Sequence, residues 1–457
     1  MKSKFKPDAN FLKTFNLLED TKENYFITGR AGTGKSTLLK YFKEHTKKNI
    51  VVLAPTGVAA VNVEGVTIHS FFRFGFGMSA NEPILKDNKR SDMFNALDCI
   101  VIDEISMVRA DVMDSIDLAL RINRKNAYEP FGGVQMILFG DLYQLPPVVE
   151  SHELENYFND NFSGPYFFNA AVFNANATNP NQSELISTTT ATLNIIELEK
   201  IYRQKDAEFK ALLEKIRNNN CDLATLDLIN SRIDPDFSLE KIGMGTEINN
   251  YELDPENLTV ILTTNNRKAA TINSAQLQSL DGKTFKYQAK TTGSFDERSY
   301  PAEAELVLKE GAQVMLLQND TEKRWQNGTI ARISALGTHE ILVNINGEDY
   351  KVEPAEWKKI EYNYDKLKKT LSQKEKGKFI QFPLKLAWAI TIHKSQGQTF
   401  EKLVVDLDRG AFAHGQTYVA LSRCTTLEGI TLTKEVKYSD IKIDNRIVEF
   451  MQRYKLQ

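Results

Sequence analysis

The chain has 457 residues, of which 42% are hydrophobic, and its 57 Lys and Arg against 60 Asp and Glu give a formal net charge of −3. At about 150 residues per domain, this length predicts about three domains. No apolar run approaches the ~18 residues of a membrane span, which excludes a membrane partner. The three cysteines form no C-x-x-C pair, which excludes a cysteine-based zinc or iron–sulfur site. The near-zero net charge also argues against a polyanion as partner.

The first part of the chain alternates short apolar runs with helical stretches. Compact apolar runs flanked by Gly, Pro or Asp predict buried parallel strands at 24–28, 50–54, 99–103 and 135–140. The stretch 108–124 has apolar residues at helical spacing. Strands that alternate with helices indicate a doubly wound α/β domain, which we expect over residues 1–190, ending in a polar linker over 174–192.

A second α/β pattern occupies residues 191–304 and 381–457. Residues 305–380 between these parts are rich in short predicted strands, and Asn346-Gly347 is a strong hairpin signal. The simplest interpretation is a small β-barrel inserted into the second α/β domain.

A phosphate-binding motif follows the first predicted strand. The segment Gly29-Arg-Ala-Gly-Thr-Gly-Lys-Ser36 matches G-x-x-x-x-G-K-[ST] between a strand and a helix. Its glycines allow backbone N–H groups to surround phosphates, and the helix N-terminus adds partial positive charge. We expect Lys35 to reach the β- and γ-phosphates of ATP and Ser36 to bind magnesium. The predicted nucleotide-binding residues are Gly32, Thr33, Gly34, Lys35, Ser36, Thr37 and Gly397.

Polar side chains follow two further predicted strands of this domain. Asp103 is suited to magnesium coordination, and Glu104 is suited to polarising the attacking water. Gln144 follows the strand 135–140 and is expected to sense the γ-phosphate or to orient the water. Because open α/β sheets present their functional loops at one edge, these residues should lie together. The domain is therefore predicted to bind and hydrolyse ATP.

An ordered set of motifs then carries a family resemblance. The set consists of GRAGTGKST (29–37), APTGVAA (54–60), TIHSFF (67–72), VIDEISM (101–107), GDLYQLPPV (140–148), YRQ (202–204), ITIHKSQGQTF (390–400) and YVALSRC (418–424). It resembles superfamily 1 helicases and, more narrowly, the petite-integration-frequency (PIF) family of DNA helicases in the 5′-to-3′, RecD-like branch. Residues 206–217 are similar to the signature segment of that family.

The resemblance implies two RecA-like domains, with a small wedge insertion in the first and a Src-homology-type β-barrel in the second. It places the wedge at residues 73–95, where Phe74, Phe76 and Met78 either form an apolar tip or simply pack. It also places arginine fingers at Arg203 and Arg423. Such a finger accelerates phosphoryl transfer by about 10³–10⁵-fold, because developing charge on the phosphoryl group requires a rigid cation.

A motor that walks on a strand needs contacts to that strand on both domains. Hydroxyls, amides and backbone N–H groups hold phosphates without reading bases, and aromatic rings stack on any base. The candidates in the first domain are Pro55, Thr56, Gly57, His69, Phe71 and Phe72, the two phenylalanines being equally compatible with a hydrophobic core. The candidates in the second domain are Thr264, Asn265, His393, Lys394, Ser395, Gln396 and Thr399.

Residues 358–378 carry eight lysines against three acids, and this segment either approaches DNA or forms a solvated loop. Superfamily 1 enzymes often select adenine with a glutamine upstream of the phosphate loop, but residues 1–28 contain none, and Asn10 is the nearest amide at a plausible offset. A net charge of −3 is compatible with a motor, because a track that is released in every cycle requires few cationic contacts.

The leading hypothesis is an ATP- and magnesium-dependent DNA helicase that moves 5′ to 3′ on single-stranded DNA. The resemblance implies action on single-strand/duplex junctions, forks, G-quadruplexes and DNA–RNA hybrids. We expect a monomer in the bacterial cytoplasm, associated with the nucleoid. Two alternatives stay open: a nucleotide-gated binding protein that does not separate strands, and an RNA-directed motor.

Overall fold

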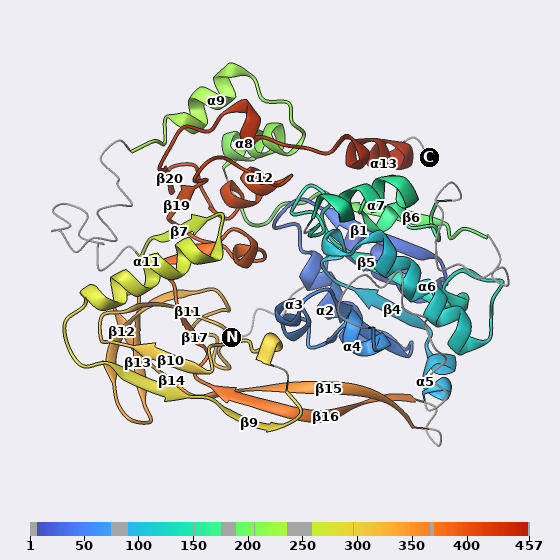
Figure 1. Ribbon diagram of the computed structural model, residues 1–457, viewed down its shortest axis with the longest axis horizontal. Coiled ribbons are helices and arrows are strands. Elements are labelled where there is room, and N and C mark those ends of the chain that lie inside the picture. The colour runs from blue at the N-terminus through green and yellow to red at the C-terminus, as the bar shows by residue number, and fades with distance from the viewer. Residues whose placement is uncertain are drawn as a thin grey trace.

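The computed structural model describes residues 7–74, 90–149, 151–174, 189–204, 206–234, 258–295, 297–365 and 370–455. Two helix-covered parallel sheets lie side by side, and antiparallel sheets extend below both of them (Figure 1). The predicted α/β class is confirmed. None of the helices in these ranges is long and apolar enough to cross a bilayer.

The first parallel sheet has six strands in the order β3-β2-β4-β5-β1-β6. Its strands are β1 (Asn24–Gly29), β2 (Ile50–Ala54), β3 (Val66–Thr67), β4 (Cys99–Ile102), β5 (Gln135–Phe139) and β6 (Leu193–Leu198). The four strands predicted from apolar runs are β1, β2, β4 and β5, and each is within two residues of its expected bounds. Their burial on both faces explains the absence of polar alternation.

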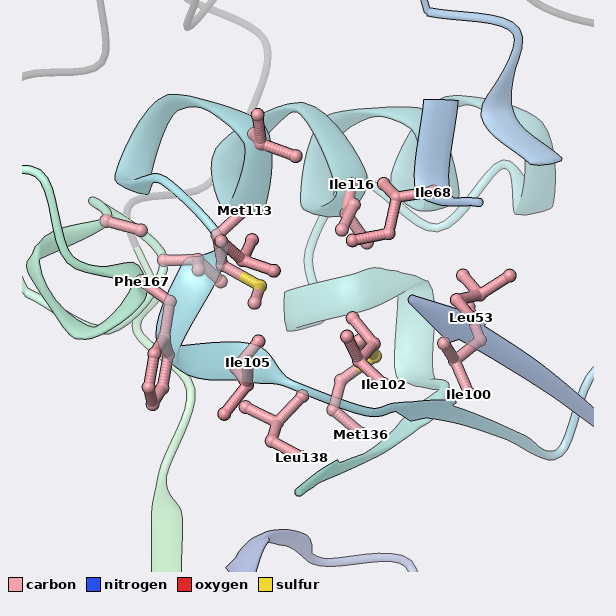
Figure 2. Close-up of a cluster of buried hydrophobic side chains, with 14 of the residues drawn as sticks. Leu53, Ile68, Ile100, Ile102, Ile105, Met113, Ile116, Met136, Leu138 and Phe167 are labelled. Atoms are coloured by element: carbon pink, nitrogen blue, oxygen red, sulfur yellow. The ribbon is translucent and has the colours of Figure 1, made fainter. Parts of the chain in front are cut away.

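Helices cover both faces of this sheet. On one face, α6 (Ala110–Arg124) packs its Met113 and Ile116 toward Ile102 and Met136 of the strands (Figure 2). On the other face, α1 (Ala9–Asp20) and α2 (Lys35–His45) contribute to a second cluster that includes Phe42. Each fully buried side chain of this kind contributes about 1.5–3 kcal/mol to stability. The sheet is therefore a rigid base for the loops that follow its strands.

The second parallel sheet has four strands in the order β18-β7-β19-β20. The strands are β7 (Val260–Thr263), β18 (Ala389–Thr391), β19 (Leu403–Asp406) and β20 (Ile430–Leu432). One face packs against α8 (Ala207–Arg217), α9 (Leu223–Asn230) and α12 (Gln416–Leu421). The other face shares a core with α11 (Asn266–Ser279) and with the inserted strands.

The inserted part is built from antiparallel strands. Five of them form the sheet β14-β13-β12-β11-β17, and β8 (Phe285–Gln288) pairs with β10 (Glu305–Leu308). The strands of the larger sheet are β11 (Gln313–Leu316), β12 (Ile330–Leu336), β13 (Ile341–Ile345), β14 (Glu348–Val352) and β17 (Leu384–Leu386). Asn346 and Gly347 form the turn between β13 and β14, with φ of 53° and 86°. The hairpin predicted from this dipeptide is confirmed.

Three of the expected domain boundaries need correction. β6 pairs along its length with β1, so the first domain continues past residue 190. The sequence assigns this strand to the second domain because it follows the polar segment 174–192, and its mixture of Asn, Glu and Ile does not show which sheet it joins. The inserted strands also begin before residue 305, with β8, and end after residue 380, with β17.

The C-terminal helix returns to the first domain, although the sequence assigns it to the second. Ile447, Phe450 and Met451 of α13 (Asn445–Lys455) join the core of the first domain. The Phe450 ring stacks on Phe168 with centroids 4.1 Å apart, and the Tyr166 hydroxyl donates to Asp444 at 2.9 Å. Figure 1 shows α13 beside α7 (His152–Phe162), a helix of the first domain.

The lysine-rich segment is not a solvated loop in the part that the structure describes. Its described part lies in a long antiparallel hairpin of β15 (Ala355–Asp365) and β16 (Thr370–Gln381), with β9 (Lys290–Gly293) at its edge. Several lysines pair with acids across the strands, including Lys376 with Glu361 at 2.9 Å. The hairpin reaches the first domain, where the Tyr362 hydroxyl accepts a hydrogen bond from the Val52 N–H at 3.3 Å.

The wedge predicted at residues 73–95 lies mostly outside the described residues, and so do Phe76 and Met78. Phe74 is described, and its ring stacks on Phe72 with centroids 5.2 Å apart. The helix α5 (Ser91–Ala96) follows the gap and packs Phe94 into the core of the first domain. Most of the linker expected over 174–192 also lies outside the described ranges.

The return of α13 leads to a stability prediction. Phe450→Ala should lower the free energy of unfolding by about 3 kcal/mol, because it removes a ring packed between Phe168, Phe167 and Phe26. Urea unfolding followed by circular dichroism measures the loss. Leu223→Ala is the control, because that side chain is 70% exposed and should change stability little. Equal effects of the two substitutions would contradict the packing of α13.

Candidate nucleotide cleft and nucleic-acid interface

The phosphate loop connects the end of β1 to the start of α2. Gly32 and Gly34 adopt left-handed backbone conformations with φ of 80° and 91°, and a Cβ atom added to Gly32 would overlap the Cβ of Arg203. Lys35 begins α2, and its ammonium donates to the backbone oxygens of Gly29 at 2.6 Å and Arg30 at 3.1 Å. Burial lowers the pKa of Lys35. A loop of this shape, with a buried amine at its centre, suits a phosphate chain.

Two acids follow β4 beside this loop. Burial and the charge of Glu104 raise the pKa of Asp103 to about 7, and burial also raises the pKa of Glu104. Glu104 adopts a left-handed backbone conformation with φ of 51°. Two adjacent, half-buried carboxyl groups favour a divalent cation, which would neutralise their repulsion.

The donors expected to hold magnesium fit that ion. Within the described ranges, no group of three or more His, Cys, Asp or Glu side chains is arranged to hold a metal. Magnesium commonly takes few protein ligands and completes its shell with water and substrate phosphates. Ser36 at the start of α2 and Asp103 after β4 have the oxygen chemistry for this role.

Asp141 and Gln144 follow β5, the next strand of the sheet. The Gln144 amide donates to Asp141 at 3.1 Å, and Arg217 of α8 donates to Asp141 at 3.2 Å. Burial alone would raise the pKa of Asp141, but Arg217 and Lys35 together lower it below its usual value. Gln144 is 8% exposed, so its amide is held in one place.

The second domain brings Arg423 into the same cleft. The Arg423 side chain is buried, and it donates to the Val419 carbonyl and the Ser422 hydroxyl, each at 3.0 Å. Among the described residues, no carboxylate lies within 4.0 Å of this guanidinium. Burial and the nearby Arg203 lower the pKa of Arg423 to about 9, while Glu104 opposes this shift. An incoming phosphate would supply the missing negative charge.

Arg203 lies in the connection between β6 and α8 and faces the phosphate loop. It donates to the backbone oxygens of Ser422 at 3.4 Å and Gly397 at 3.3 Å. Gly397 thus lies at the cleft, next to the arginine rather than to the phosphate loop itself. The Tyr418 hydroxyl accepts a hydrogen bond from the Ala31 N–H at 3.2 Å, so the two domains are in contact around the loop.

Polar groups outside the cleft lie at the ends of strands in both domains. Thr56 follows β2, is exposed, and caps α3 (Gly57–Asn62). His69 lies half-buried on α4 (Ile68–Phe72), and burial lowers its pKa. In the second domain Asn265 is exposed and caps α11. His393 and Lys394 lie on a short 3₁₀ turn after β18.

Comparison with known proteins identifies the family. The PIF1-like helicase family model matches residues 12–225. The ATP-dependent DNA helicase Pif1 of Campylobacter jejuni is 30% identical over 477 residues, covering 94% of this chain and 95% of that protein. The chain belongs to the PIF1-like helicase family. It spans about three fifths of the length of the fungal and vertebrate relatives that it matches.

Solved structures of Pif1 from Bacteroides sp are similar over nearly the whole chain. The unliganded structure gives a TM-score of 0.84 at 36% identity and covers 99% of this chain and 98% of its own. A complex with ADP-AlF4 gives 0.84 at 35% identity. A structure bound to ssDNA gives 0.66 at 35% identity and the same coverage as the unliganded one. The arrangement of this PIF1-like chain is therefore more similar to the unliganded and ADP-AlF4 structures than to the ssDNA-bound one.

Three of the predicted nucleic-acid contacts have little accessible side-chain surface in this PIF1-like structure. Phe71 is 3% exposed, and its ring packs against Phe94 and Tyr362 in the core, so it offers no face to a base. The Ser395 side chain is fully buried and donates to the Ile392 carbonyl at 2.7 Å. Thr264 is 8% exposed. The sequence places these residues beside exposed ones but does not show which side chains turn inward.

The remaining candidates are at least partly accessible. Phe72 is half-buried and packs on Phe74 and Phe94. Partly or fully exposed candidates are Pro55, Thr56, Gly57, His69, Asn265, His393, Lys394, Gln396 and Thr399. Their role as strand contacts stays a prediction.

Several residues at the cleft were not singled out by the sequence. Tyr418 lies within the motif YVALSRC and Tyr202 within YRQ. Both motifs therefore contain cleft residues other than their arginines. The Tyr202 ring is 57% exposed and lies beside Gly34, at the mouth of the cleft. Glu214 and Arg217 belong to the signature segment, and both contact loops of the first domain.

The raised pKa of Asp103 leads to a pH-dependent prediction. In the folded, nucleotide-free protein this carboxyl group stays protonated to about pH 7, whereas in the unfolded chain it ionises near 3.8. Wild-type stability should therefore fall as pH rises between these values. Asp103→Asn removes the ionisation and should stabilise the protein more at pH 8 than at pH 5.

Urea unfolding at the two pH values tests this. The control is Asp227→Asn, at an exposed position on α9, and it should have little effect at either pH. A stabilisation by Asp103→Asn that is equal at pH 5 and pH 8 would reject the prediction.

Proposed function

We propose that this protein is an ATP-dependent DNA helicase that translocates 5′ to 3′ on single-stranded DNA and unwinds duplex DNA. The observation that carries the proposal is that Lys35 of the phosphate loop and Arg423 of the second domain both lie close enough to Glu104 to act on its charge, at the boundary between the two domains. Relatives of this chain bear the name ATP-dependent DNA helicase, and the structural relative from Bacteroides binds ssDNA in one of its solved forms.

The cleft supports ATP hydrolysis that depends on closure of the domains. Lys35 and the left-handed glycines receive the phosphates, while Ser36 and Asp103 hold magnesium. Glu104 polarises the attacking water, and Gln144 orients it. Arg423, assisted by Arg203, neutralises the charge that develops on the transferring phosphoryl group. Because these arginines lie beyond the first sheet, the reaction proceeds only when the cleft is closed.

The coupling to DNA follows from what lies beside the cleft. Loops after β2 and β18 present polar groups on the two domains, and hydroxyls, amides and backbone N–H groups hold phosphates of any sequence. A relative movement of the domains therefore changes the distance between the two sets of polar groups that hold the strand. The low net charge of −3 agrees with a strand that is released in each cycle.

The finer parts of the proposal come from the family. They are the 5′-to-3′ direction, action on forks, G-quadruplexes and DNA–RNA hybrids, function as a monomer, and a bacterial cytoplasmic, nucleoid-associated setting. The structure of Bacteroides Pif1 with ADP-AlF4 supports use of ATP. Magnesium is supported by the paired acids Asp103 and Glu104 beside the phosphate loop.

A strand-displacement assay tests the proposal. The purified protein is mixed with ATP, magnesium and duplexes that carry a 5′ DNA tail, a 3′ DNA tail or a 5′ RNA tail. Release of the strand only from the 5′ DNA tail supports the proposal. Release from the RNA tail alone would identify an RNA-directed motor, and ATP hydrolysis without release from any duplex would identify a nucleotide-gated binding protein.

Lys35→Ala should abolish ATP hydrolysis and strand displacement together, because the phosphate chain loses its buried cation. Both activities are measured on the same 5′-tailed duplex. Lys40→Ala on the same helix is the matched control, because the Lys40 side chain is 76% exposed and pairs with Glu44. ATP-driven unwinding by the Lys35→Ala protein would exclude this site as the motor.

Arg423→Ala should slow hydrolysis by about 10³-fold, the lower end of the effect of an arginine finger, while nucleotide binding persists. Single-turnover hydrolysis and titration with a fluorescent ADP separate the two effects. Near-normal turnover would show that Arg423 acts only as a packing residue.

A further inference from the structure

Helix α8 belongs to the second domain but contacts two loops of the first. Asp206 caps its start by accepting from the Phe209 N–H, and Phe209, Leu212 and Ile216 anchor the helix in the core of the second domain. One turn apart near its end, Glu214 pairs with Arg30 of the phosphate loop at 2.6 Å, and Arg217 pairs with Asp141. The helix therefore contacts both phosphate-facing loops of the first domain while it is anchored in the core of the second domain.

The contact between Arg217 and Asp141 is buried almost completely. The side chains are 5% and 0% exposed, and the Arg217 guanidinium also lies 3.9 Å from the centre of the Tyr143 ring. Arg217 is the last residue of α8, where the helix dipole favours a positive charge. A buried charge is costly unless it is paired, so Asp141 depends on this arginine from the other domain.

Asp141 in turn fixes the amide of Gln144. One carboxylate oxygen accepts from Arg217 and from the Tyr143 N–H at 3.2 Å, and the other accepts from Gln144 Nε2 at 3.1 Å. Because the amide nitrogen faces Asp141, the amide oxygen Oε1 faces away from it. That oxygen is the atom that accepts a hydrogen bond from an attacking water.

The second domain also approaches this loop through Gly415, which precedes α12. A Cβ atom at Gly415 would overlap the backbone oxygens of Tyr143 and Gln144. Only a glycine permits this approach, so the loop of Gln144 lies between Gly415 and Arg217 when the domains are in contact.

We infer that Arg217 is a positioning residue for ATP hydrolysis: by pairing with Asp141 across the domain boundary, it sets the amide of Gln144 when the cleft closes. This role rests on the proposed ATPase function and assigns a task to the signature segment. It makes water orientation conditional on closure, independently of the arginine finger. Separation of α8 from the first domain would take Arg217 away from Asp141, the residue that holds the Gln144 amide.

The test is a kinetic cycle between Arg217 and Gln144 in the full-length protein. Arg217→Met removes the charge at similar volume, Arg217→Lys keeps the charge without the guanidinium fork, and Gln144→Ala removes the amide. Turnover with saturating ssDNA, the KM for ATP, and affinity for a fluorescent ADP are measured for the single variants and for the double variants with Gln144→Ala.

Arg217→Met should reduce kcat by about tenfold or more, and the KM for ATP should change by less than about twofold. Arg217→Lys should retain more activity than Arg217→Met, because it keeps a cation for Asp141. In the Gln144→Ala background, neither Arg217 substitution should reduce kcat further, because residues that act through one another are not additive.

Additive losses would overturn the inference, because they would show that Arg217 supports the fold or the closed state generally. If Arg217→Met fails to fold, the cycle with Arg217→Lys decides by the same criterion. Arg232→Met is the matched control, because Arg232 of the second domain donates to the backbone oxygens of Glu428 and Ile430, outside the cleft. It should leave kcat unchanged and be additive with Gln144→Ala.

The ATPase activity of the wild-type protein distinguishes failure of this inference from failure of the proposed function. A wild-type protein that hydrolyses ATP, together with an additive cycle, rejects the role of Arg217 alone. A wild-type protein without ATPase activity rejects both.

Discussion

Buried charges from different domains depend on one another in the cleft. Asp141 of the first domain pairs with Arg217 of the second, and Glu104 acts on Arg423 across the same boundary. Ionised groups held away from water are costly unless they are paired, so neither half of the site is complete by itself. The placement of the arginines, the amide of Gln144 and the contact of Tyr418 with the phosphate loop all follow from this shared cleft.

One short segment connects the cleft to the predicted nucleic-acid contacts. Residues 393–397 carry the exposed Lys394 and the half-buried His393, while the backbone oxygens of Ser395 and Gly397 lie 3.5 Å and 3.3 Å from nitrogens of Arg423 and Arg203. Movement of either arginine therefore acts directly on the turn that carries the outward groups. Under the proposed function, nucleotide state and strand contact would be linked through these few peptide units.

The sequence was informative where the chemistry is local. The phosphate loop, the strands before Asp103 and Asp141, and the turn at Asn346 each follow from a few neighbouring residues. The sequence was less informative where tertiary packing determines which sheet a strand joins or which side chains are buried. The edge strand β6 follows the polar linker and is assigned from sequence to the second domain, although it pairs with β1 of the first. Phe71 and Ser395 turn inward beside exposed neighbours. The partner of Arg217 lies 76 residues away in the chain, so only the fold reveals it.

The path of the chain has a mechanical consequence. The chain leaves the first domain after β6 and returns to it through α13, whose Phe450 is stacked on Phe168. The second domain is thus tethered at both of its ends to one rigid body. Under the proposed function, these two attachments limit how the second domain can move against the first, and the contact of Tyr362 with Val52 adds a third restraint.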